Sequence, residues 1–530
     1  MKSTAIMVTA SMIAMVLYWM FLSKGGRMPP GPIGLPFVGY LPFLTSEPHL
    51  DFQNLSKIYG PVFSVRLGSK YVIVLNDFSS IKYVFSYEDF VKKPSECSYD
   101  LRRHSVGPFA KTEDYVSILM YCCTSFEYFC TLDISHFLEF YRMSEISALP
   151  VEEWKFFLQI LRQFDLSRTL LFEKYIRDEL TGLLLLMQRM EGRPFLTKPL
   201  LSRSISKSIA LTMFGGKLPY TDIASIETVS VLRETERLVS QKSWQSFFPW
   251  MKIIPQILDV EKGIELRKFQ DRLQFFIFQE IEKNEKNSDA NSIHGFIDFY
   301  LLEIQKSVNH SSCSKFKFDL FLEKFLQDVM KSIFSAGNEF VRITVDWLLL
   351  IMAAYPEMQR KIHLEIDEII GRSHFPRIFD YSRMPFTNAV IMEVMRWRTI
   401  SPLGIIPGIH DDLEVNGYFI PKDSWVVLNL WAVHHSHEYW SGDPDVFRPE
   451  RFLTEDRKYV LKKDYFIPFS MGNKSCPGKN LATAETFLYF TAILQKFTLS
   501  LPLGKDADLN GRLHLGLEPI QQKLIFRQRG

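Results

Sequence analysis

The sequence has few cysteines, almost no excess charge and no dinucleotide-binding motif. Its 530 residues include six cysteines, and no two of them form a Cys-x-x-Cys pair. This usage fits a reducing compartment and argues against both a disulfide framework and a structural zinc site. The formal net charge of +2 argues against a nucleic-acid binder. A Gly-x-Gly-x-x-Gly fingerprint is also absent, so the chain shows no dinucleotide site of its own.

The first 36 residues contain an apolar run followed by a proline-rich segment. Thr4 to Leu22 carries no charge and approaches the roughly 20 residues that a helix needs to cross a bilayer. A cleaved signal peptide is the competing interpretation, but the run is long for one and no small-x-small cleavage site follows it. We therefore expect a membrane anchor at 1–23, a stiff, basic and proline-rich hinge at 24–36, and a folded domain at 37–530. Lys24 and Arg27 favour a cytosolic position for this domain.

Apolar residues make up 47% of the chain, enough for a large core, and their spacing predicts the first elements. Leu50 to Tyr59 has the spacing of an amphipathic helix. Val62–Leu67 and Tyr71–Leu75 have strand patterns on either side of Gly68, which predicts a hairpin.

Later segments predict one long helix and further strands. Phe318 to Tyr355 is apolar on several helical faces, which indicates a helix buried on several sides. Gly417–Lys422 and Trp425–His435 predict a strand, a turn and a second strand. Gly516–Pro519 and Lys523–Phe526 predict a closing hairpin.

The most informative stretch is Phe-Ser-Met-Gly-Asn-Lys-Ser-Cys-Pro-Gly at 469–478. Gly472 and Gly478 allow tight turns and a close approach of the backbone to a flat ligand. The helical spacing of 479–490 places Cys476 just before a helix N-terminus, which lowers a thiol's pKa and favours the thiolate. For an isolated cysteine, a buried and inert residue would be the better interpretation.

The spacing Phe-x-x-Gly-x-x-x-Cys-x-Gly closely resembles the haem-thiolate loop of the cytochrome P450 family. The resemblance implies that Cys476 is the axial ligand of the iron in haem b. Lys474 stands where the family usually has Arg, so it keeps the charge for a haem propionate but loses the planar fork. The other residues implied to contact the cofactor are Phe469, Gly472, Gly478 and Gly337.

Two further motifs precede the loop in the order that the family has. Glu393 and Arg396 form Glu-x-x-Arg, and Arg451 lies in Phe-Arg-Pro-Glu-Arg-Phe at 447–452. The resemblance implies that these three residues form a buried ion-paired triad with a structural role.

The long predicted helix contains a segment that resembles the family's oxygen-binding Ala-Gly-x-(Asp/Glu)-Thr. Here it is Ala-Gly-Asn-Glu-Phe, so Glu339 is the implied catalytic acid that relays protons. Phe340 replaces the Thr whose hydroxyl steadies iron-bound dioxygen. Thr344 lies one turn further on, roughly 5.4 Å away, a gap that a water could bridge.

The chain departs most from the family between about 104 and 151. This stretch is rich in aromatic residues and lacks a helical or strand period. It is either a real insertion or translated non-coding sequence in a faulty gene model. The family's Trp-x-x-x-Arg follows, with Trp154 present, Leu158 in place of Arg, and Arg162 two turns on.

The resemblance implies a mainly α cytochrome P450 fold with a large helical lobe, a small β-rich lobe and an N-terminal transmembrane helix. The adjacent His434 and His435 then belong to a structural turn rather than a metal site. Two short segments, 347–356 and 396–399, resemble the Phantom-like ecdysteroid 25-hydroxylases of arthropods. A steroid such as an ecdysteroid precursor is the substrate that this implies.

The implied function is that of a haem-thiolate monooxygenase held in the endoplasmic reticulum membrane by a single-pass anchor, with a cytosolic catalytic domain. Electrons would come from NADPH through cytochrome P450 reductase, with cytochrome b5, membrane lipid and a lipophilic small molecule as further partners. Phe340 leaves two alternatives open: a haem-dependent isomerase or dehydratase, and a non-catalytic haem or sterol binder.

Overall fold

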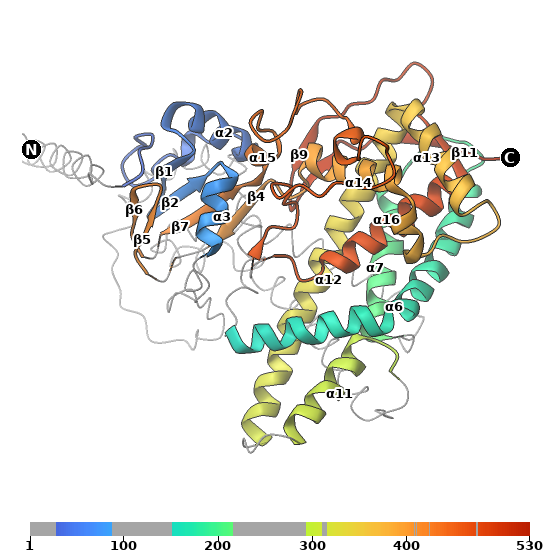
Figure 1. The fold of residues 1–530 in the computed structure, drawn as a ribbon, viewed down its shortest axis with the longest axis horizontal. Helices are drawn as coiled ribbons and strands as arrows, with labels where there is room; N and C mark the ends of the chain where they lie inside the picture. The colour runs from blue at the N-terminus through green and yellow to red at the C-terminus, as the bar shows by residue number, and fades with distance from the viewer. Residues whose placement is uncertain are drawn as a thin grey trace, which may run out of the picture. The chain divides into compact units, whose positions relative to one another are not determined.

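A computed structural model describes residues 28–86, 151–215, 293–309, 315–406, 409, 411–422, 424–472 and 475–530. These residues form two compact units (Figure 1). The β-rich unit comprises the described residues of 28–86 and 403–432. The helical unit comprises those of 151–215, 293–402 and 433–530. This division agrees with the expected small β-rich lobe and large helical lobe.

The β-rich unit is built on a four-stranded sheet in the order β1-β2-β7-β4. Its strands are β1 (Val62–Leu67), β2 (Lys70–Leu75), β7 (Trp425–Asn429) and β4 (Leu403–Ile406). β1 and β2 pair antiparallel, which confirms the predicted hairpin. β7 pairs parallel with β2 and antiparallel with β4, and all five of its residues are buried. The unit also holds η1 (Leu41–Phe43), α2 (Pro48–Tyr59), α3 (Phe78–Ser86), β5 (Leu413–Val415) and β6 (Tyr418–Ile420).

The expected strand from Trp425 to His435 is wrong in its second half. Leu430–His434 forms a short helix, α15, directly after β7. The Asn429 side-chain oxygen accepts the Ala432 N–H at 3.2 Å, which caps the first turn of this helix. A short apolar run fits a strand and a buried helix equally well, so its period alone does not decide between them.

The proline-rich segment is tied to β1 over its described part. The Ser64 N–H donates to the Pro30 carbonyl at 2.8 Å, and the Ser64 hydroxyl donates to the Pro29 carbonyl at 2.7 Å. A Cβ on Gly31 would lie only 1.7 Å from the Ser64 carbonyl oxygen. The described part of this segment is therefore held against β1, and only glycine fits at 31.

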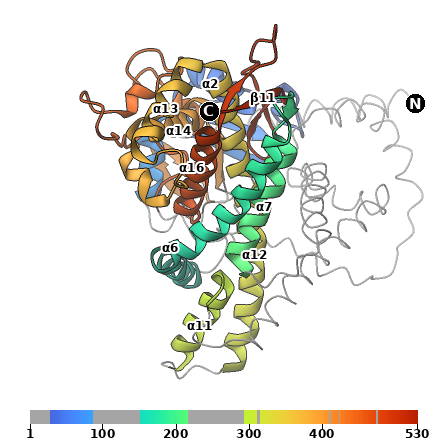
Figure 2. The same ribbon diagram turned by 90° about the vertical axis from the view of Figure 1, so that its right-hand side faces the viewer.

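The helical unit packs α6, α7, α12 and α16 against one another (Figure 2). Its helices are α6 (Val151–Gln188), α7 (Lys198–Phe214), α11 (Phe296–Asn309), α12 (Lys315–Ala354), α13 (Pro356–Ile369), α14 (Pro385–Arg398) and α16 (Lys479–Lys496), with the 3-10 helices η6 (Ile378–Arg383) and η7 (Pro449–Phe452). α12 confirms the long helix predicted at 318–355. It ends where Pro356 begins α13, because proline cannot continue the hydrogen-bond ladder.

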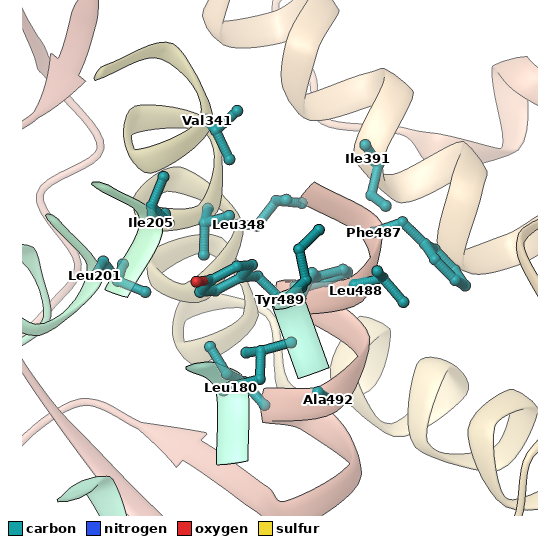
Figure 3. Close-up of a cluster of buried hydrophobic side chains, with 14 of the residues drawn as sticks. Leu180, Leu201, Ile205, Val341, Leu348, Ile391, Phe487, Leu488, Tyr489 and Ala492 are labelled. Atoms are coloured by element: carbon teal, nitrogen blue, oxygen red, sulfur yellow. The ribbon is translucent and has the colours of Figure 1, made fainter. Parts of the chain in front are cut away.

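Apolar side chains from four helices fill the centre of this unit. Figure 3 shows Tyr489 of α16 beside Leu180 of α6, Ile205 of α7 and Leu348 of α12, and all four side chains are buried. Every residue of α16 from Glu485 to Gln495 is buried, which fits the apolar runs at 487–490 and 492–494.

A neighbouring helix caps the start of α14, the helix that carries Glu393 and Arg396. The backbone N–H groups of Phe386 and Thr387 each donate to the Glu365 carboxylate of α13 at 2.8 Å. The Thr387 hydroxyl donates to the same carboxylate at 2.6 Å. These bonds satisfy helix-terminal donors that lack a partner within α14 and fix its axis against α13.

The C-terminal strands form two small sheets rather than the single hairpin expected from 516–526. β10 (Leu517–Pro519) pairs with β9 (Gly511–Leu513), while β11 (Lys523–Gln528) lies between β3 (Phe195–Leu196) and β8 (Phe497–Ser500). The prediction is wrong because each strand finds its partner in another segment.

Among the described residues, no helix combines the length and apolarity needed to cross a membrane. The anchor expected at 1–23 lies outside these residues. The anomalous stretch at about 104–151 also lies outside them, apart from Val151, where α6 begins.

Glu485 on α16 is an acidic side chain enclosed by the helical core. It is 1% exposed and accepts a hydrogen bond from the Ser208 hydroxyl of α7. Burial raises the pKa of Glu485 to about 8, although the Ser208 hydrogen bond works in the opposite direction. The carboxyl group is therefore protonated at neutral pH in the folded protein.

Glu485 should make the folded protein less stable as pH rises. Its folded pKa lies above the ordinary 4.5, so between pH 4.5 and about 8 the unfolded chain loses this proton more readily. The free energy of unfolding should fall by up to roughly 1.4 kcal/mol per pH unit in this window. Glu485→Gln should remove that slope in urea unfolding curves, whereas Glu357→Gln, at an exposed position on α13, should leave it intact. An unchanged slope in Glu485→Gln would contradict the assignment.

Candidate functional site

The loop before α16 is held by its own backbone. The Cys476 N–H donates to the Phe469 carbonyl at 2.8 Å, and the Ser475 N–H donates to the Gly472 carbonyl at 3.1 Å. Gly472 has φ +60°, in the left-handed region that favours glycine. Gly478 is the residue before the first turn of α16, so Cys476 lies next to the helix N-terminus as predicted. Lys474 lies outside the described residues.

The Cys476 thiol is free and its side chain is exposed. Enough protein nevertheless surrounds the sulfur for burial to raise its pKa, while the Gly478 N–H and Lys479 lower it in part. The net direction is upward, so the lower pKa expected from a position just before a helix is wrong for this thiol. The surrounding protein outweighs the Gly478 N–H and Lys479.

Gly337 on α12 has a packing reason of its own. A Cβ at this position would lie 3.2 Å from the terminal methyl carbon Cδ1 of Ile209 on α7. The group that approaches the backbone here is therefore a side chain of a neighbouring helix. A cofactor contact for Gly337 remains a prediction.

Glu339 belongs to a buried network of charges centred on Arg342. The Arg342 Nε donates to Glu339 Oε2 at 3.0 Å. The other two guanidinium nitrogens reach Asp346 at 3.2 Å and Glu518 of β10 at 2.9 Å. Arg342 is 1% exposed. The Glu339 carboxylate, which the resemblance implies is a proton carrier, is thus ion-paired with the buried Arg342.

The network continues beyond α12, where a second cation, Lys198, joins Arg342 and the three carboxylates. Lys198 at the start of α7 donates to Glu518 at 2.8 Å, and the Thr197 hydroxyl donates to Asp346. Burial works to lower the pKa of Arg342, but its three carboxylate neighbours raise it above the ordinary value. For the acids, burial acts in the opposite direction and raises the pKa of Asp346. In Glu518 burial also acts to raise the pKa, but Arg342 and Lys198 outweigh it and the pKa is lowered.

The hydroxyl expected to compensate for Phe340 is already engaged. Thr344 Oγ1 donates to the Phe340 carbonyl within the same helix at 2.7 Å. The Phe340 ring lies against the turn at Gly516, where an added Cβ would be 3.1 Å from the ring carbon Cε1. Neither of the two groups expected to manage protons, Glu339 and Thr344, is without a protein partner.

Glu393, Arg396 and Arg451 come together as the resemblance implies. Arg396 donates to the Glu393 carboxylate through Nε at 2.7 Å and Nη2 at 2.9 Å, and Arg451 Nε donates to it at 3.0 Å. Glu393 and Arg396 are fully buried. The remaining guanidinium N–H groups donate to backbone carbonyls, those of His434 and Pro444 for Arg396, and of Ser441, Asp443 and Val446 for Arg451.

A sequence model of the family described as "Cytochrome P450" matches residues 29–111 and 133–526. The chain belongs to the cytochrome P450 family. Its relatives include cytochrome P450 2F2 of Mus musculus, 32% identical over 492 residues, covering 92% of this chain and 90% of that protein. Cytochrome P450 18a1 of Drosophila melanogaster is 29% identical over 533 residues, covering 99% of this chain and 92% of that protein. Cytochrome P450 2J2 of Homo sapiens is 30% identical over 505 residues, with 94% and 90% covered.

As a member of this family the protein is a monooxygenase that uses haem b, takes electrons from NADPH through a reductase and acts on a lipophilic substrate. The residues present fit a haem. The loop offers one free, exposed thiol, and the described residues contain no group of three His, Cys, Asp or Glu side chains able to hold a metal ion. One thiolate is too few for a protein-bound zinc, but it is the single axial ligand that a haem iron needs from the protein.

The sequence pointed to the loop and the triad but missed the partners of Glu339. Arg342 follows Glu339 by three residues and Asp346 follows Arg342 by four, helical spacings that could have been used as a signal. Glu518 is 176 residues away from Arg342, and no local pattern connects the two. Arg162, two turns after Trp154, is exposed at the surface.

Breaking the triad should unfold much of the helical unit. Glu393→Gln leaves Arg396 and Arg451 charged and without their shared carboxylate, a change that typically costs about 3–5 kcal/mol. Urea unfolding of the holoprotein should show this loss. Glu303→Gln breaks the more exposed Lys306–Glu303 pair of α11 and should change stability little. Equal stabilities for the two variants would show that the triad is not a structural requirement.

Proposed function

We propose that this cytochrome P450 hydroxylates a lipophilic, steroid-like substrate through a haem held by Cys476. The observation that carries the proposal is the free Cys476 thiol, held by a backbone bond to Phe469 at the start of α16. When bound, the haem supplies the activation of dioxygen. One oxygen atom enters a substrate C–H bond and the other leaves as water, with two electrons from NADPH and two protons.

The remaining site residues are assigned roles by position. Phe469, Gly472 and Gly478 shape the loop around the thiolate, and Gly337 lies on the helix that carries Glu339. Lys474 pairs with a haem propionate. Glu339 relays protons, and because Oε2 is engaged by Arg342, the relay requires the ion pair to loosen or Oε1 to carry the proton.

The steroid assignment rests on two segments that resemble ecdysteroid 25-hydroxylases. Residues of both segments make contacts within the folded protein. Trp347 is fully buried and its indole N–H donates to the Leu517 carbonyl at 2.7 Å. Arg398 lies 3.6 Å from the centre of the Trp397 ring. Their support for a steroid substrate is therefore through relatedness and not through substrate contact.

The domain and membrane assignments follow from the apolar run, the proline-rich segment and the family membership. Residues 1–23 anchor the protein in the endoplasmic reticulum membrane, 24–36 form the hinge, and 37–530 form a cytosolic catalytic domain that meets membrane lipid, the reductase and cytochrome b5. The family match leaves 112–132 unmatched, inside the anomalous stretch at 104–151. This gap supports an origin of that stretch outside the family's common sequence.

One observation favours a second function, that of a haem-dependent isomerase or dehydratase. Phe340 carries no hydroxyl, Thr344 donates to a backbone carbonyl, and Glu339 is paired with Arg342. An enzyme of this kind needs neither NADPH nor a reductase. Turnover of a steroid panel with and without NADPH and dioxygen separates it from a hydroxylase.

The absorption spectrum of the reduced, carbon-monoxide-bound protein tests the site first. The wild-type protein should show the red-shifted Soret band of thiolate-ligated haem, because Cys476 supplies the fifth ligand. Cys476→Ala should lose this band, and the control Cys313→Ala should keep it. A wild-type protein without the band, or a Cys476→Ala variant that retains it, would overturn the assignment.

Phe340→Thr should raise the amount of product formed per NADPH consumed by roughly twofold or more, because a hydroxyl at this position can take part in proton delivery. Phe340→Leu is the matched control, since it removes the ring without adding a hydroxyl. The measurement is product against NADPH oxidation in the reconstituted system. If both variants have the wild-type ratio, position 340 does not limit proton delivery.

A further inference from the structure

His434, at the end of α15, links three segments of the helical unit. Its side chain is fully buried. The ring nitrogen Nε2 accepts the backbone N–H of Ile467 at 3.1 Å, and Nδ1 lies 3.1 Å from Thr399 Oγ1. Ile467 lies two residues before Phe469, and Thr399 follows the last residue of α14.

The hydrogen bonds fix which ring nitrogen carries the proton. A backbone N–H can only donate, so Nε2 must be the acceptor. A neutral imidazole then carries its proton on Nδ1 and donates it to Thr399 Oγ1. That hydroxyl can accept, because its own proton goes to the Arg396 carbonyl at 2.6 Å. Burial, together with His435 and Arg396, lowers the pKa of His434 well below its ordinary value, which agrees with a neutral ring.

The backbone of His434 is held by the triad at the same time. Arg396 Nη1 donates to the His434 carbonyl at 2.7 Å while Nε and Nη2 of the same guanidinium bind Glu393. The imidazole also packs near the rings of Phe466, at 5.8 Å between centroids, and Trp440, at 6.4 Å. The ring therefore has a fixed position from which to hold Ile467.

From Ile467 the hydrogen bonds continue to the backbone of Cys476. The Ser470 N–H donates to the Ile467 carbonyl at 3.0 Å, and the Cys476 N–H donates to the Phe469 carbonyl at 2.8 Å. Displacing Ile467 would move the acceptor that holds the Cys476 backbone. An imidazole that lies 33 residues before Ile467 in the sequence thus connects the triad to the loop.

The Thr399 end of the link needs support. Its φ of +38° is unusual for a β-branched residue, because the side chain crowds the backbone in the left-handed region. The bonds from Thr399 Oγ1 to the Arg396 carbonyl and to His434 Nδ1 offset that strain. One imidazole therefore stabilises both the end of α14 and the start of the cysteine loop.

We infer that His434 is a positioning residue for the iron ligand: it fixes the entrance of the cysteine loop against α14, so that Cys476 presents its sulfur at one position. This inference rests on the proposed role of Cys476 as the haem ligand. His434 would act on the cysteine loop through its hydrogen bond with the Ile467 N–H.

Two amide substitutions distinguish the hydrogen bond of Nε2 from that of Nδ1. In His434→Gln the amide reaches about as far as Nε2 and can still accept the Ile467 N–H. In His434→Asn it ends near Nδ1 and can satisfy only Thr399. If the link acts on the ligand, the reduced carbon-monoxide band of thiolate-ligated haem should decay about tenfold faster in His434→Asn than in His434→Gln, because a buried backbone donor is left without a partner.

The exposed His437→Asn, in the same segment, is the matched control and should keep the wild-type decay rate. Urea unfolding of the same proteins measures general destabilisation, which the two amides should share. Equal decay rates for His434→Asn and His434→Gln would overturn the inference while leaving the haem assignment intact. A wild-type protein without the thiolate band would instead overturn the haem assignment and this inference together.

Discussion

A single carboxylate, Glu393, holds together the parts of the helical unit that bear on the cysteine loop. It is fully buried and binds two guanidinium groups, one from its own helix and one from η7. Removing three charges from water is costly, and the arrangement persists because every partner is satisfied. The Arg448 N–H also donates to Glu393, at 2.9 Å, so the carboxylate fixes the backbone of the segment before η7 as well as its side chains.

The consequences of this interaction spread outward in two directions. Glu365 caps the start of α14 from α13, so the helix bearing Glu393 cannot rotate freely. At its other end, Arg396 grips the His434 carbonyl, and His434 in turn holds Ile467 near the cysteine loop. By our inference, the position of Cys476 therefore depends on polar contacts of Arg396 and His434, earlier in the sequence, as well as on the loop itself.

The buried network around Arg342 bears on proton transfer rather than on the cysteine loop. Arg342 is surrounded by Glu339, Asp346 and Glu518, so the acid that the family motif marks for proton transfer is part of an ion-paired cluster. The Thr344 hydroxyl is likewise bound to the Phe340 carbonyl, so both polar side chains expected to manage protons have protein partners. In the proposed proton relay, delivery depends on how readily that cluster releases Glu339.

The sequence by itself determined the features that local pattern or short motifs encode. Alternating residues around Gly68 specify the β1–β2 hairpin, apolar helical spacing specifies α12 and α16, and the cysteine loop carries its own glycines. These features depend on residues close in the chain, where spacing translates directly into a face or a turn. The family resemblance, carried by ordered motifs, added the expectation that Glu393, Arg396 and Arg451 meet.

Only the tertiary structure decided the pairings between distant segments. It showed that Leu430–His434 is helical, because a short apolar run has no unique period, and that β10 and β11 do not pair with each other. It also brought Glu518 to Arg342 and Ile467 to His434, contacts between residues 176 and 33 positions apart. Such contacts follow from how whole helices and strands pack, and packing depends on many side chains at once, which no local pattern in the sequence records.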